Sequence, residues 1–396
     1  MTLGQSLPEQ CAAALFFLAC ALVFHTYVAY PAFLRVLIWL GFRSDVHHAA
    51  RSAPTDWAPT VCVVVAAHNE ARVIEPRVQN LLAQDYPRER YSVLIVSDGS
   101  TDDTVHLASN YGPNGVKVID NKLQRGRAAC HNDAVAAASE EILVFTDADT
   151  VFEPDFLRQI VRPFISPRVG VATGQLGFVN TGVNGVAQSA GLYWRYELWL
   201  RQMESVLGCL ATASGACMAV RRALIKPLLR TDDVDYSTPL DVIMQGHVAV
   251  HESTAVAYDS MPSTVLGEIR ARTRQVAKNL PGTLRKLREL SPLRFPLLAF
   301  SVASHKLLRW LTPVFLLVIL GTNPVLVNSS RVFAVVLALQ VAFYLAAGLG
   351  CVGQRMGARI PMASTAFGFC VANIAFFLGT VKALFFQQVT SYRSQQ

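Results

Sequence analysis

The sequence predicts an open, doubly wound α/β sheet held between membrane-spanning helices. Three runs of strand length, 61–67, 92–96 and 141–145, are continuously apolar after the first residues Ser92 and Glu141 of the second and third, and they alternate with helical patterns. Continuous apolar strands are typical of a parallel sheet that is covered on both faces. Charge-free stretches long enough to cross a bilayer lie before and after this alternation. Together these observations predict one α/β domain between an N-terminal anchor and several C-terminal spans.

The composition of the 396-residue chain supports the membrane segments. Hydrophobic residues make up 52% and charged residues 16%, which is too apolar a balance for an ordinary soluble protein. Four stretches run without Asp, Glu, Lys or Arg for about 20 residues or more, the length that a hydrocarbon core requires. Buried core helices are the alternative, but soluble cores rarely run this long without a charge. The four stretches lie between Glu9 and Arg35, Arg309 and Arg331, Arg331 and Arg355, and Arg359 and Lys382.

The four stretches differ in regularity and in their flanking charges. Pro313 and the pair Asn323-Pro324 interrupt the second stretch. No Lys or Arg precedes the first, whereas Arg35 and Arg43 follow it, so we expect an uncleaved anchor with a cytoplasmic C-terminal flank. The resulting prediction is a multi-pass protein of the cell (inner) membrane, with the segment after this anchor in the cytoplasm.

Much of the net charge of +7 lies in residues 268–294, which hold eight Lys or Arg against Glu268 and Glu289. Because a membrane span follows directly, membrane lipids or a diphosphate are favoured over nucleic acid as the partner of this segment. We therefore predict no nucleic-acid partner. A membrane-interface belt is predicted just beyond, at His305, Lys306, Arg309 and Trp310.

Several kinds of site are disfavoured by what the chain lacks. The eight Cys form no CxxC pair and show no zinc-ligand spacing, so they are interpreted as small buried hydrophobic residues. No GxGxxG follows the first strand, which leaves a dinucleotide-binding Rossmann domain without support. A nucleotidyltransferase is disfavoured because no glycine-rich phosphate loop follows that strand either.

These patterns divide the chain into four parts. Helical patterns at 71–84, from about 101–103 and at 127–139 separate the apolar strands and complete the α/β alternation. The predicted parts are an N-terminal membrane anchor at 1–40, a linker at 41–60, the α/β domain at 61–290, and interfacial and transmembrane helices with about three spans at 291–390.

Polar side chains follow each of three predicted strands. In an open α/β sheet, ligands bind at the carboxyl ends of the strands, so these side chains are expected to share one edge of the sheet. The three segments are Ala67-His68-Asn69-Glu70, Ser97-Asp98-Gly99-Ser100-Thr101-Asp102-Asp103 and Thr146-Asp147-Ala148-Asp149-Thr150.

Asp147 and Asp149 are candidates for a metal site. Two carboxylates that are separated by one residue beyond a buried strand repel each other, and a hard divalent cation removes that conflict. Mg²⁺ and Mn²⁺ commonly use one or two protein carboxylates together with phosphate oxygens of a substrate. The alternative is that Asp149 or Thr150 caps a helix beginning near Pro154.

The segment Asp98-Gly99-Ser100 has two interpretations. It fits an ordinary strand-to-helix turn in which Gly99 permits a close approach of the backbone. It also fits a nucleotide site in which Asp98 accepts hydrogen bonds from a base or a ribose.

Taken together, the three strand ends resemble the family 2 glycosyltransferases of the GT-A fold, in the membrane-bound, polysaccharide-synthase-like branch related to cellulose and hyaluronan synthases. Their order and spacing carry the resemblance, which covers roughly residues 60–290. Further matching segments are Gln124-Arg125-Gly126-Arg127 with Asn132, Tyr193 to Trp199, Ser214-Gly215-Ala216, Arg221-Arg222, Asp235 to Leu240, Gln245-Gly246, and Arg270, Arg274 and Gln275.

The resemblance implies roles for individual residues. Asn69, Glu70 and Asp98, with Gly99 beside them, would hold the nucleobase and the ribose. Asp147 would contact the nucleotide, and Asp149 would bind the metal beneath the diphosphate. The remaining implied substrate contacts are Arg127 near the phosphates, Ser214 and Gly215 at the sugar and acceptor pocket, and the basic-helix residues Arg270, Arg274 and Gln275.

A catalytic base is required independently of the resemblance, because inverting sugar transfer needs a carboxylate that deprotonates the acceptor hydroxyl. Asp235 is our choice and Asp233 is the alternative, since related synthases carry Thr-Glu-Asp or Asp-Asp where this chain has Asp233-Val234-Asp235. For Asp232 and Asp233 a solvated acidic loop also remains open.

The resemblance implies inverting transfer of a sugar from a nucleotide sugar, expected to be UDP-linked, to a lipid-linked or growing glycan acceptor at the cytoplasmic membrane face. Cell-surface polysaccharide or glycolipid synthesis would be the setting. The QxxRW pattern of processive synthases is replaced by Arg270-Ala-Arg-Thr-Arg-Gln275, which puts processivity in doubt. The alternative function is a membrane transporter or scaffold with a degenerate nucleotide-binding domain.

Overall fold

The computed structural model describes residues 7–44, 46, 57–179, 185–260, 264–358 and 360–385, with only the backbone of 185–192. Most of the predicted linker 41–60 lies outside the described residues, and so does Arg359.

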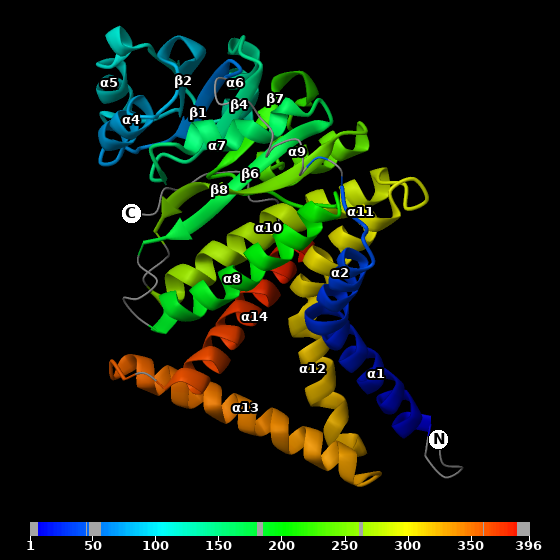
Figure 1. Cartoon of the computed structure of the whole chain (residues 1–396). Helices are drawn as coiled ribbons and strands as arrows, with labels where there is room; N and C mark the ends of the chain where they lie inside the picture. The colour runs from blue at the N-terminus through cyan, green and yellow to red at the C-terminus, as the bar shows by residue number, and fades with distance from the viewer. Residues whose placement is uncertain are drawn as a thin grey trace.

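The α/β domain is built on one eight-stranded mixed sheet with the order β3-β2-β1-β4-β7-β6-β8-β5 (Figure 1). The first four strands of this order are parallel, as the sequence predicts. Beyond them β7 pairs antiparallel with both β4 and β6, while β8 runs parallel to β6 and antiparallel to β5. The strands are β1 Val61–Ala67, β2 Tyr91–Asp98, β3 Val116–Asn121, β4 Ile142–Thr146, β5 Val151–Phe152, β6 Val169–Phe178, β7 Met218–Arg221 and β8 Val248–Asp259.

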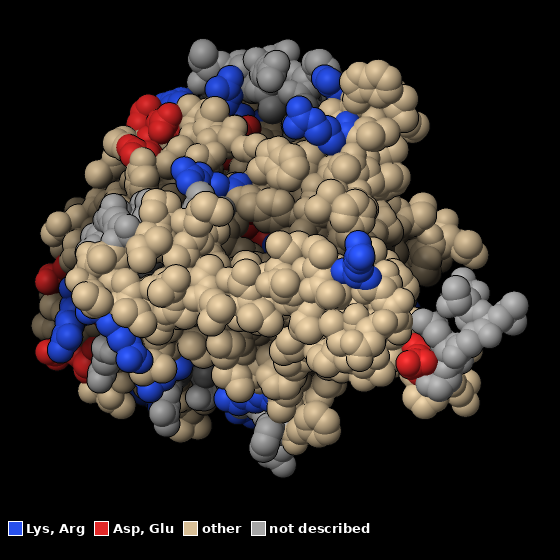
Figure 2. Space-filling view, turned by 90° about the horizontal axis from the view of Figure 1, so that it is seen from below, with Lys and Arg blue, Asp and Glu red and all other residues tan. Residues whose placement is uncertain are grey.

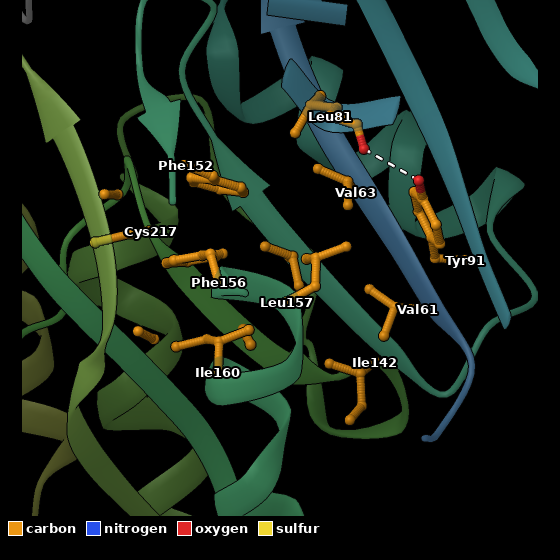
Figure 3. Packing of buried hydrophobic residues seen from close by; sticks show 14 of the residues in the cluster. Val61, Val63, Leu81, Tyr91, Ile142, Phe152, Phe156, Leu157, Ile160 and Cys217 are labelled. Carbon is orange, nitrogen blue, oxygen red and sulfur yellow. Dashed lines mark hydrogen bonds between the residues drawn. The ribbon is translucent and has the colours of Figure 1, made fainter. Parts of the chain in front are cut away.

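The apolar run of β1 is continuous because the sheet is covered on both faces. Val61, Val63 and Val65 belong to a core with α4 (Ile74–Leu82), α5 (Thr104–Ser109) and α7 (Phe156–Val161), and Figure 3 shows the α7 side chains packed against this side. Cys62 and Val64 face the opposite core with α6 (Arg127–Ala137) and α9 (Val234–Met244). Successive side chains of a strand point to opposite faces, so both sets must be apolar.

The helix after the third motif begins later than the sequence suggested. α7 starts at Phe156 and its N-cap is Asp155, so neither Asp149 nor Thr150 caps it. The capping interpretation of these two residues is therefore wrong, and the carboxylate of Asp149 is left for another use.

In the part of the chain that the structure describes, four helical segments are long and apolar enough to cross a membrane: Leu7–Trp39, Pro296–Leu326, Arg331–Arg355 and Pro361–Phe385. They coincide with the four predicted stretches, although the second begins well before Arg309. Pro313 and Pro324 lie inside its helix without ending it. The first segment consists of α1 (Leu7–Phe24), a π-helical turn (His25–Ala29) and α2 (Tyr30–Trp39). The second consists of α11 (Pro296–Ser301), a second π-helical turn (Val302–Leu307) and α12 (Leu308–Leu326). The third and fourth are the single helices α13 (Arg331–Arg355) and α14 (Pro361–Phe385).

Two long helices separate the sheet from these segments. α8 (Gly185–Val206) and α10 (Val265–Glu289) lie side by side beneath the sheet, and α14 packs along α10 (Figure 1). On the face seen from below, side chains without charge form a broad middle band, and most of the Lys and Arg groups lie around it (Figure 2).

The predicted membrane-interface belt is wrong for its charged members. His305, Lys306 and Arg309 are buried at 0%, 8% and 1% exposure, because α8 covers them and supplies acidic partners. Glu197 accepts hydrogen bonds from Lys306 (3.0 Å) and Arg309 (2.5 Å), and Glu204 lies 2.6 Å from His305. We call Glu197, Arg201, Glu204, His305, Lys306 and Arg309 the junction cluster. It joins the α/β domain to the second membrane segment.

Two glycines test the packing of the membrane helices. A Cβ at Gly379 of α14 would lie 2.6 Å from Val276 Cβ and 2.9 Å from the Thr273 carbonyl of α10, whereas Gly348 of α13 has open space. Gly348→Ala should stabilise by about 0.5–1 kcal/mol through helix propensity, and Gly379→Ala should destabilise by about 1–3 kcal/mol through overpacking. Thermal unfolding in detergent measures both. A stabilising Gly379→Ala would contradict the close packing of α10 and α14.

Candidate functional site

The loops after β1 and β2 are hydrogen-bonded to each other. Asn69 adopts a positive φ of 57°, and its side-chain oxygen accepts a hydrogen bond from the backbone N–H of Thr101 (2.8 Å). The backbone N–H of Glu70 donates to Thr104 Oγ1 (2.8 Å). Asn69 therefore serves to join the two loops, and its contact with a nucleobase stays a prediction.

Asp98 fixes the loop between β3 and α6. Its carboxylate is 3% exposed and accepts hydrogen bonds from the backbone N–H groups of Arg125 (2.7 Å) and Gly126 (3.0 Å). Gly99 has a φ of +68°, and a Cβ there would lie 2.7 Å from the backbone nitrogen of Gln124. Both residues thus position the turn that precedes α6. Direct contact of Asp98 with a base or ribose stays a prediction.

The turn held by Asp98 places Arg127 beside the end of β4. Arg127 is the first residue of α6 and forms an ion pair with Asp147. The neighbouring Thr146 is fixed by Arg77, which donates to its hydroxyl (2.6 Å), and by the Ala216 carbonyl, which accepts from it (2.8 Å). The strand end is therefore rigid where the acidic motif begins.

At this edge the charge of Asp149 acts on two other carboxylates, those of Glu70 and Asp259, and we call these three residues the acidic edge. Burial and then the charge of Asp149 raise the pKa of Asp259 to about 6. Burial, followed by Asp149 and Asp102, raises the pKa of Glu70 to about 7. The pairing of Val151 with Tyr258 between β5 and β8 explains why Asp149 and Asp259 come together. Such mutual repulsion is the condition that a bound cation relieves.

Next to the acidic edge lies a cavity of about 390 Å³, which we call the polar cavity. Its walls come from the sheet edge and also from α8, α10 and α12. Eight of the predicted site residues line it: Arg127, Asp147, Ser214, Gly215, Asp233, Asp235, Arg274 and Gln275. The other predicted residues at the sheet edge, Asn69, Glu70, Asp98, Gly99 and Asp149, are not among its walls.

Asp233 and Asp235 lie together in the polar cavity but differ in their partners. Asp233 is the N-cap of α9 and forms an ion pair with Lys278 of α10. Asp235 packs against Gly215, where an added Cβ would lie 3.3 Å from its Cγ. Burial, followed by the charge of Asp233, raises the pKa of Asp235. Within the described residues Asp235 makes no ion pair with a cation of α10.

Comparison with known proteins agrees with this geometry. Residues 62–229 match the model of glycosyl transferase family 2. The chain contains a family 2 glycosyltransferase domain. It is 29% identical over 194 residues to the beta-monoglucosyldiacylglycerol synthase of Synechocystis sp., covering 48% of this chain and 40% of that protein. It is 24% identical over 223 residues to the poly-beta-1,6-N-acetyl-D-glucosamine synthase of Staphylococcus epidermidis, covering 54% and 53%. The chain thus spans about half the length of the curated relatives it matches.

A solved structure extends the similarity beyond the family 2 domain. The mannosyltransferase PcManGT from Pyrobaculum calidifontis, in complex with GDP-Man and Mn²⁺, superposes with a TM-score of 0.71 at 22% identity. The superposition covers 96% of this chain and 99% of that chain. At this identity the likeness shows the fold, which is of the GT-A type with long apolar helices at both ends.

The basic helix α10 of the α/β domain differs from its prediction. Four of its cations pair with acids of the same domain: Arg272 with Glu268, Lys278 with Asp233, Arg285 with Asp232 and Lys286 with Asp241. Three of these pairs join α10 to α9 or to the residues just before it, and the fourth, Arg272 with Glu268, lies within α10, so these four cations already have acidic partners in the chain. The interpretation of Asp232 and Asp233 as a solvated acidic loop is wrong for the same reason.

The sequence predicts Arg270 as a substrate contact, but Arg270 does not line the polar cavity. The residues of α10 that line the polar cavity include 268, 271, 272, 275 and 279, which recur at the helical period. Arg270 is exposed and lies off this face, and Arg272 takes the inward place.

The sequence also missed Arg77 and Asp259. Arg77 sits in an amphipathic helical pattern, where a cation is expected on the solvent face, yet it is 3% exposed and burial lowers its pKa to about 9. Asp259 ends a strand whose pairing with β5 is only two residues long. Its approach to Asp149 depends on that pairing, which leaves no local signal in the sequence.

The raised pKa values at the acidic edge predict how stability changes with pH. Because the folded pKa values of Glu70 and Asp259, about 7 and about 6, lie above ordinary carboxyl values, the folded protein binds more protons than the unfolded chain between about pH 4 and 7. Stability should therefore fall as the pH rises through this window. Glu70→Gln should flatten part of the fall in Tm, measured in detergent without divalent cations.

The matched control for this measurement is Glu89→Gln, which changes an exposed carboxylate of a short turn before β2. It should leave the slope of Tm against pH unchanged. Equal slopes for wild type and Glu70→Gln would contradict the electrostatic role given to Glu70.

Proposed function

We propose that the protein is an inverting glycosyltransferase. It moves a sugar from a nucleotide sugar, UDP-linked in our proposal, to the hydroxyl of a lipid-linked or growing glycan acceptor. The observation that carries the proposal is that Arg127, Asp147, Asp235 and Asp259 line one cavity, and that Asp149 lies near enough to Asp259 to raise its pKa. The family 2 domain and the GT-A-type fold support it.

A divalent cation, Mg²⁺ or Mn²⁺, fits the acidic edge. The charge of Asp149 contributes to the raised pKa of Asp259, and hard oxygen donors of this kind suit such a cation. Asp149, with Asp147 nearby, would hold it, and Asp259 is a further ligand candidate. Among the residues that the structure describes no cluster of three or more protein ligands is preformed, so substrate phosphate oxygens or water would complete the shell. The cation would neutralise charge on the diphosphate leaving group.

Asp235 is the proposed catalytic base. Its neighbour Asp233 is already engaged in an ion pair with Lys278. The raised pKa of Asp235 brings the carboxylate closer to the operating pH, where a base is most effective. Ser214, held by its backbone N–H to Thr173 Oγ1 (3.0 Å), and Gly215 would shape the pocket in front of it.

Arg127 is proposed to contact the donor phosphates. A guanidinium makes strong charge-assisted hydrogen bonds to phosphate, and Arg127 stands between the sheet edge and the polar cavity. In the structure its partner is Asp147. We infer that the donor exchanges this internal pair for a contact with its diphosphate.

The setting proposed for this reaction is the cytoplasmic face of the cell membrane, in polysaccharide or glycolipid synthesis. The four apolar helical segments support a membrane location, and the Lys and Arg flanks support the orientation. The names of the two relatives refer to a glycolipid and a polysaccharide, which supports this range of products. A degenerate transporter or scaffold domain is not favoured, because its acidic groups would have no reason to converge on one cavity.

Two isosteric changes test the base. Asp235→Asn should lower transfer of labelled sugar to endogenous acceptor in membranes by about 10²–10⁴-fold, with donor binding kept. Asp233→Asn should lower transfer less, because Asp233 acts through its pair with Lys278. A panel of nucleotide sugars with Mn²⁺ provides the assay. A larger loss in Asp233→Asn would move the base to that residue.

The cation site is tested without turnover. Asp149→Ala should abolish the rise in Tm that Mn²⁺ produces in wild type, because a cation bound only to the folded state stabilises it. Asp120→Ala changes an exposed carboxylate paired with Lys122 and serves as the control. An unchanged Mn²⁺ response in Asp149→Ala would remove Asp149 from the metal site.

A further inference from the structure

A second cavity of about 210 Å³ lies beneath α8 and α10, and we call it the apolar cavity. Its walls come from α14, from Tyr27 of the first π-helical turn, and from the lower sides of α8 and α10. Phe367, Phe369, Val371 and Ala372 of α14 make it apolar. α14 is a membrane-span candidate, so the wall that it supplies belongs to a segment suited to contact with lipid chains.

The two cavities share part of their walls. Tyr193, Glu268, Arg272 and Phe376 line both of them. Arg272 pairs with Glu268, and its guanidinium lies 4.3 Å from the centre of the Tyr193 ring. A single elongated molecule could therefore reach from the apolar cavity to the polar cavity past these four side chains.

The membrane side of the polar cavity has an excess of positive charge. Four cations line it there against two carboxylates: Arg201, Arg272, Lys306 and Arg309 against Glu197 and Glu268. Arg309 is 1% exposed, and its Nε and Nη2 have no hydrogen-bond partner in the described part of the chain. Leaving these buried donors without hydrogen bonds costs free energy, and the tyrosine rings near the guanidinium offset only part of that cost. A buried, incompletely bonded cation beside a cavity indicates an anionic ligand.

The sheet side of the same cavity holds Asp235. The order from membrane to sheet is thus an apolar cavity, a cationic zone and a carboxylate without an α10 partner. A ligand that matches this order has an apolar chain, a phosphate and a hydroxyl, in that sequence.

We propose that the acceptor is a lipid in which a phosphate joins the apolar chain to a hydroxyl-bearing head. The chain lies in the apolar cavity, the phosphate lies against Arg309 and Arg272, and the hydroxyl reaches Asp235. This inference rests on the proposed function. The acceptor oxygen forms the new bond to the anomeric carbon of the sugar, the bond from that carbon to the diphosphate breaks, Asp235 takes the hydroxyl proton, and the nucleoside diphosphate leaves.

Three lipids with identical chains separate the requirements. Diacylglycerol has a hydroxyl but no phosphate, phosphatidic acid has a phosphate but no head hydroxyl, and phosphatidylglycerol has both. Native mass spectrometry of the full-length protein in detergent should show both phosphate lipids bound at least about tenfold tighter than diacylglycerol. With nucleotide sugars and Mn²⁺, only phosphatidylglycerol should receive labelled sugar. Equal binding of all three lipids would overturn the phosphate contact.

Variants of α14 locate the binding site. Ala372→Phe fills the apolar cavity and should abolish binding of the phosphate lipids, whereas Ile374→Phe, on the exposed face of the same helix, should keep it. Gly368→Phe is a second filling variant should Ala372→Phe unfold, with Tm as the check on folding. Retained lipid binding in a folded filling variant would place the lipid elsewhere and overturn the proposal.

Donor hydrolysis separates this inference from the proposed function. Slow release of nucleoside diphosphate without acceptor requires only the sheet edge, so it should persist in Ala372→Phe. If the wild type hydrolysed a nucleotide sugar but transferred no sugar to phosphatidylglycerol, the proposed acceptor would be wrong. The proposed glycosyltransferase activity would not be contradicted. If the wild type hydrolysed no nucleotide sugar, the proposed glycosyltransferase activity would be wrong. The lipid-binding measurements would still show whether the lipid binds in the apolar cavity.

Discussion

The buried carboxylate of Glu197 is the interaction on which the arrangement of domain and membrane helices depends. It lies within 3.1 Å of Arg201, His305, Lys306 and Arg309. Burial by itself would raise the pKa of Glu197, but these neighbouring groups hold it well below the ordinary range. Removing one member of such a buried set typically costs about 3–5 kcal/mol, because the other charges lose their partner. The cluster thereby fixes α8 on the second membrane segment, and the sheet edge keeps one position above the membrane.

At the sheet edge, carboxylates lie near other carboxylates instead of near cations. Where the junction cluster neutralises a carboxylate with several cations, the acidic edge leaves Glu70, Asp149 and Asp259 to repel one another. Charges that are unfavourable in the free protein mark places where a ligand supplies the missing partner. The cationic excess around Arg309 is the complementary case. A cation at one side and a phosphate lipid at the other would each satisfy groups that the chain itself leaves unsatisfied.

The predictable parts of the fold are those with a local physical signature. β1, β2 and β4 were predictable because a strand that is buried on both faces must be apolar at every position. The four membrane segments were predictable because a bilayer excludes charge over about 20 residues. The contact between the loops after β1 and β2 followed from the rule that strand ends share an edge. The mixed half of the sheet was not predicted, since antiparallel pairing of β7 with β4 leaves no comparable pattern.

The sequence by itself determined the α/β alternation, the apolar spans and most of the carboxylates proposed to act, because each depends on residues close together in the chain. Only the tertiary structure decided which charges are free. It paired Lys278 with Asp233, turned Arg270 outward, buried Arg309 and brought Asp259 to Asp149. Those outcomes depend on helix packing and strand register between distant segments, and a side chain's charge alone does not reveal whether its partner is another part of the chain or a ligand.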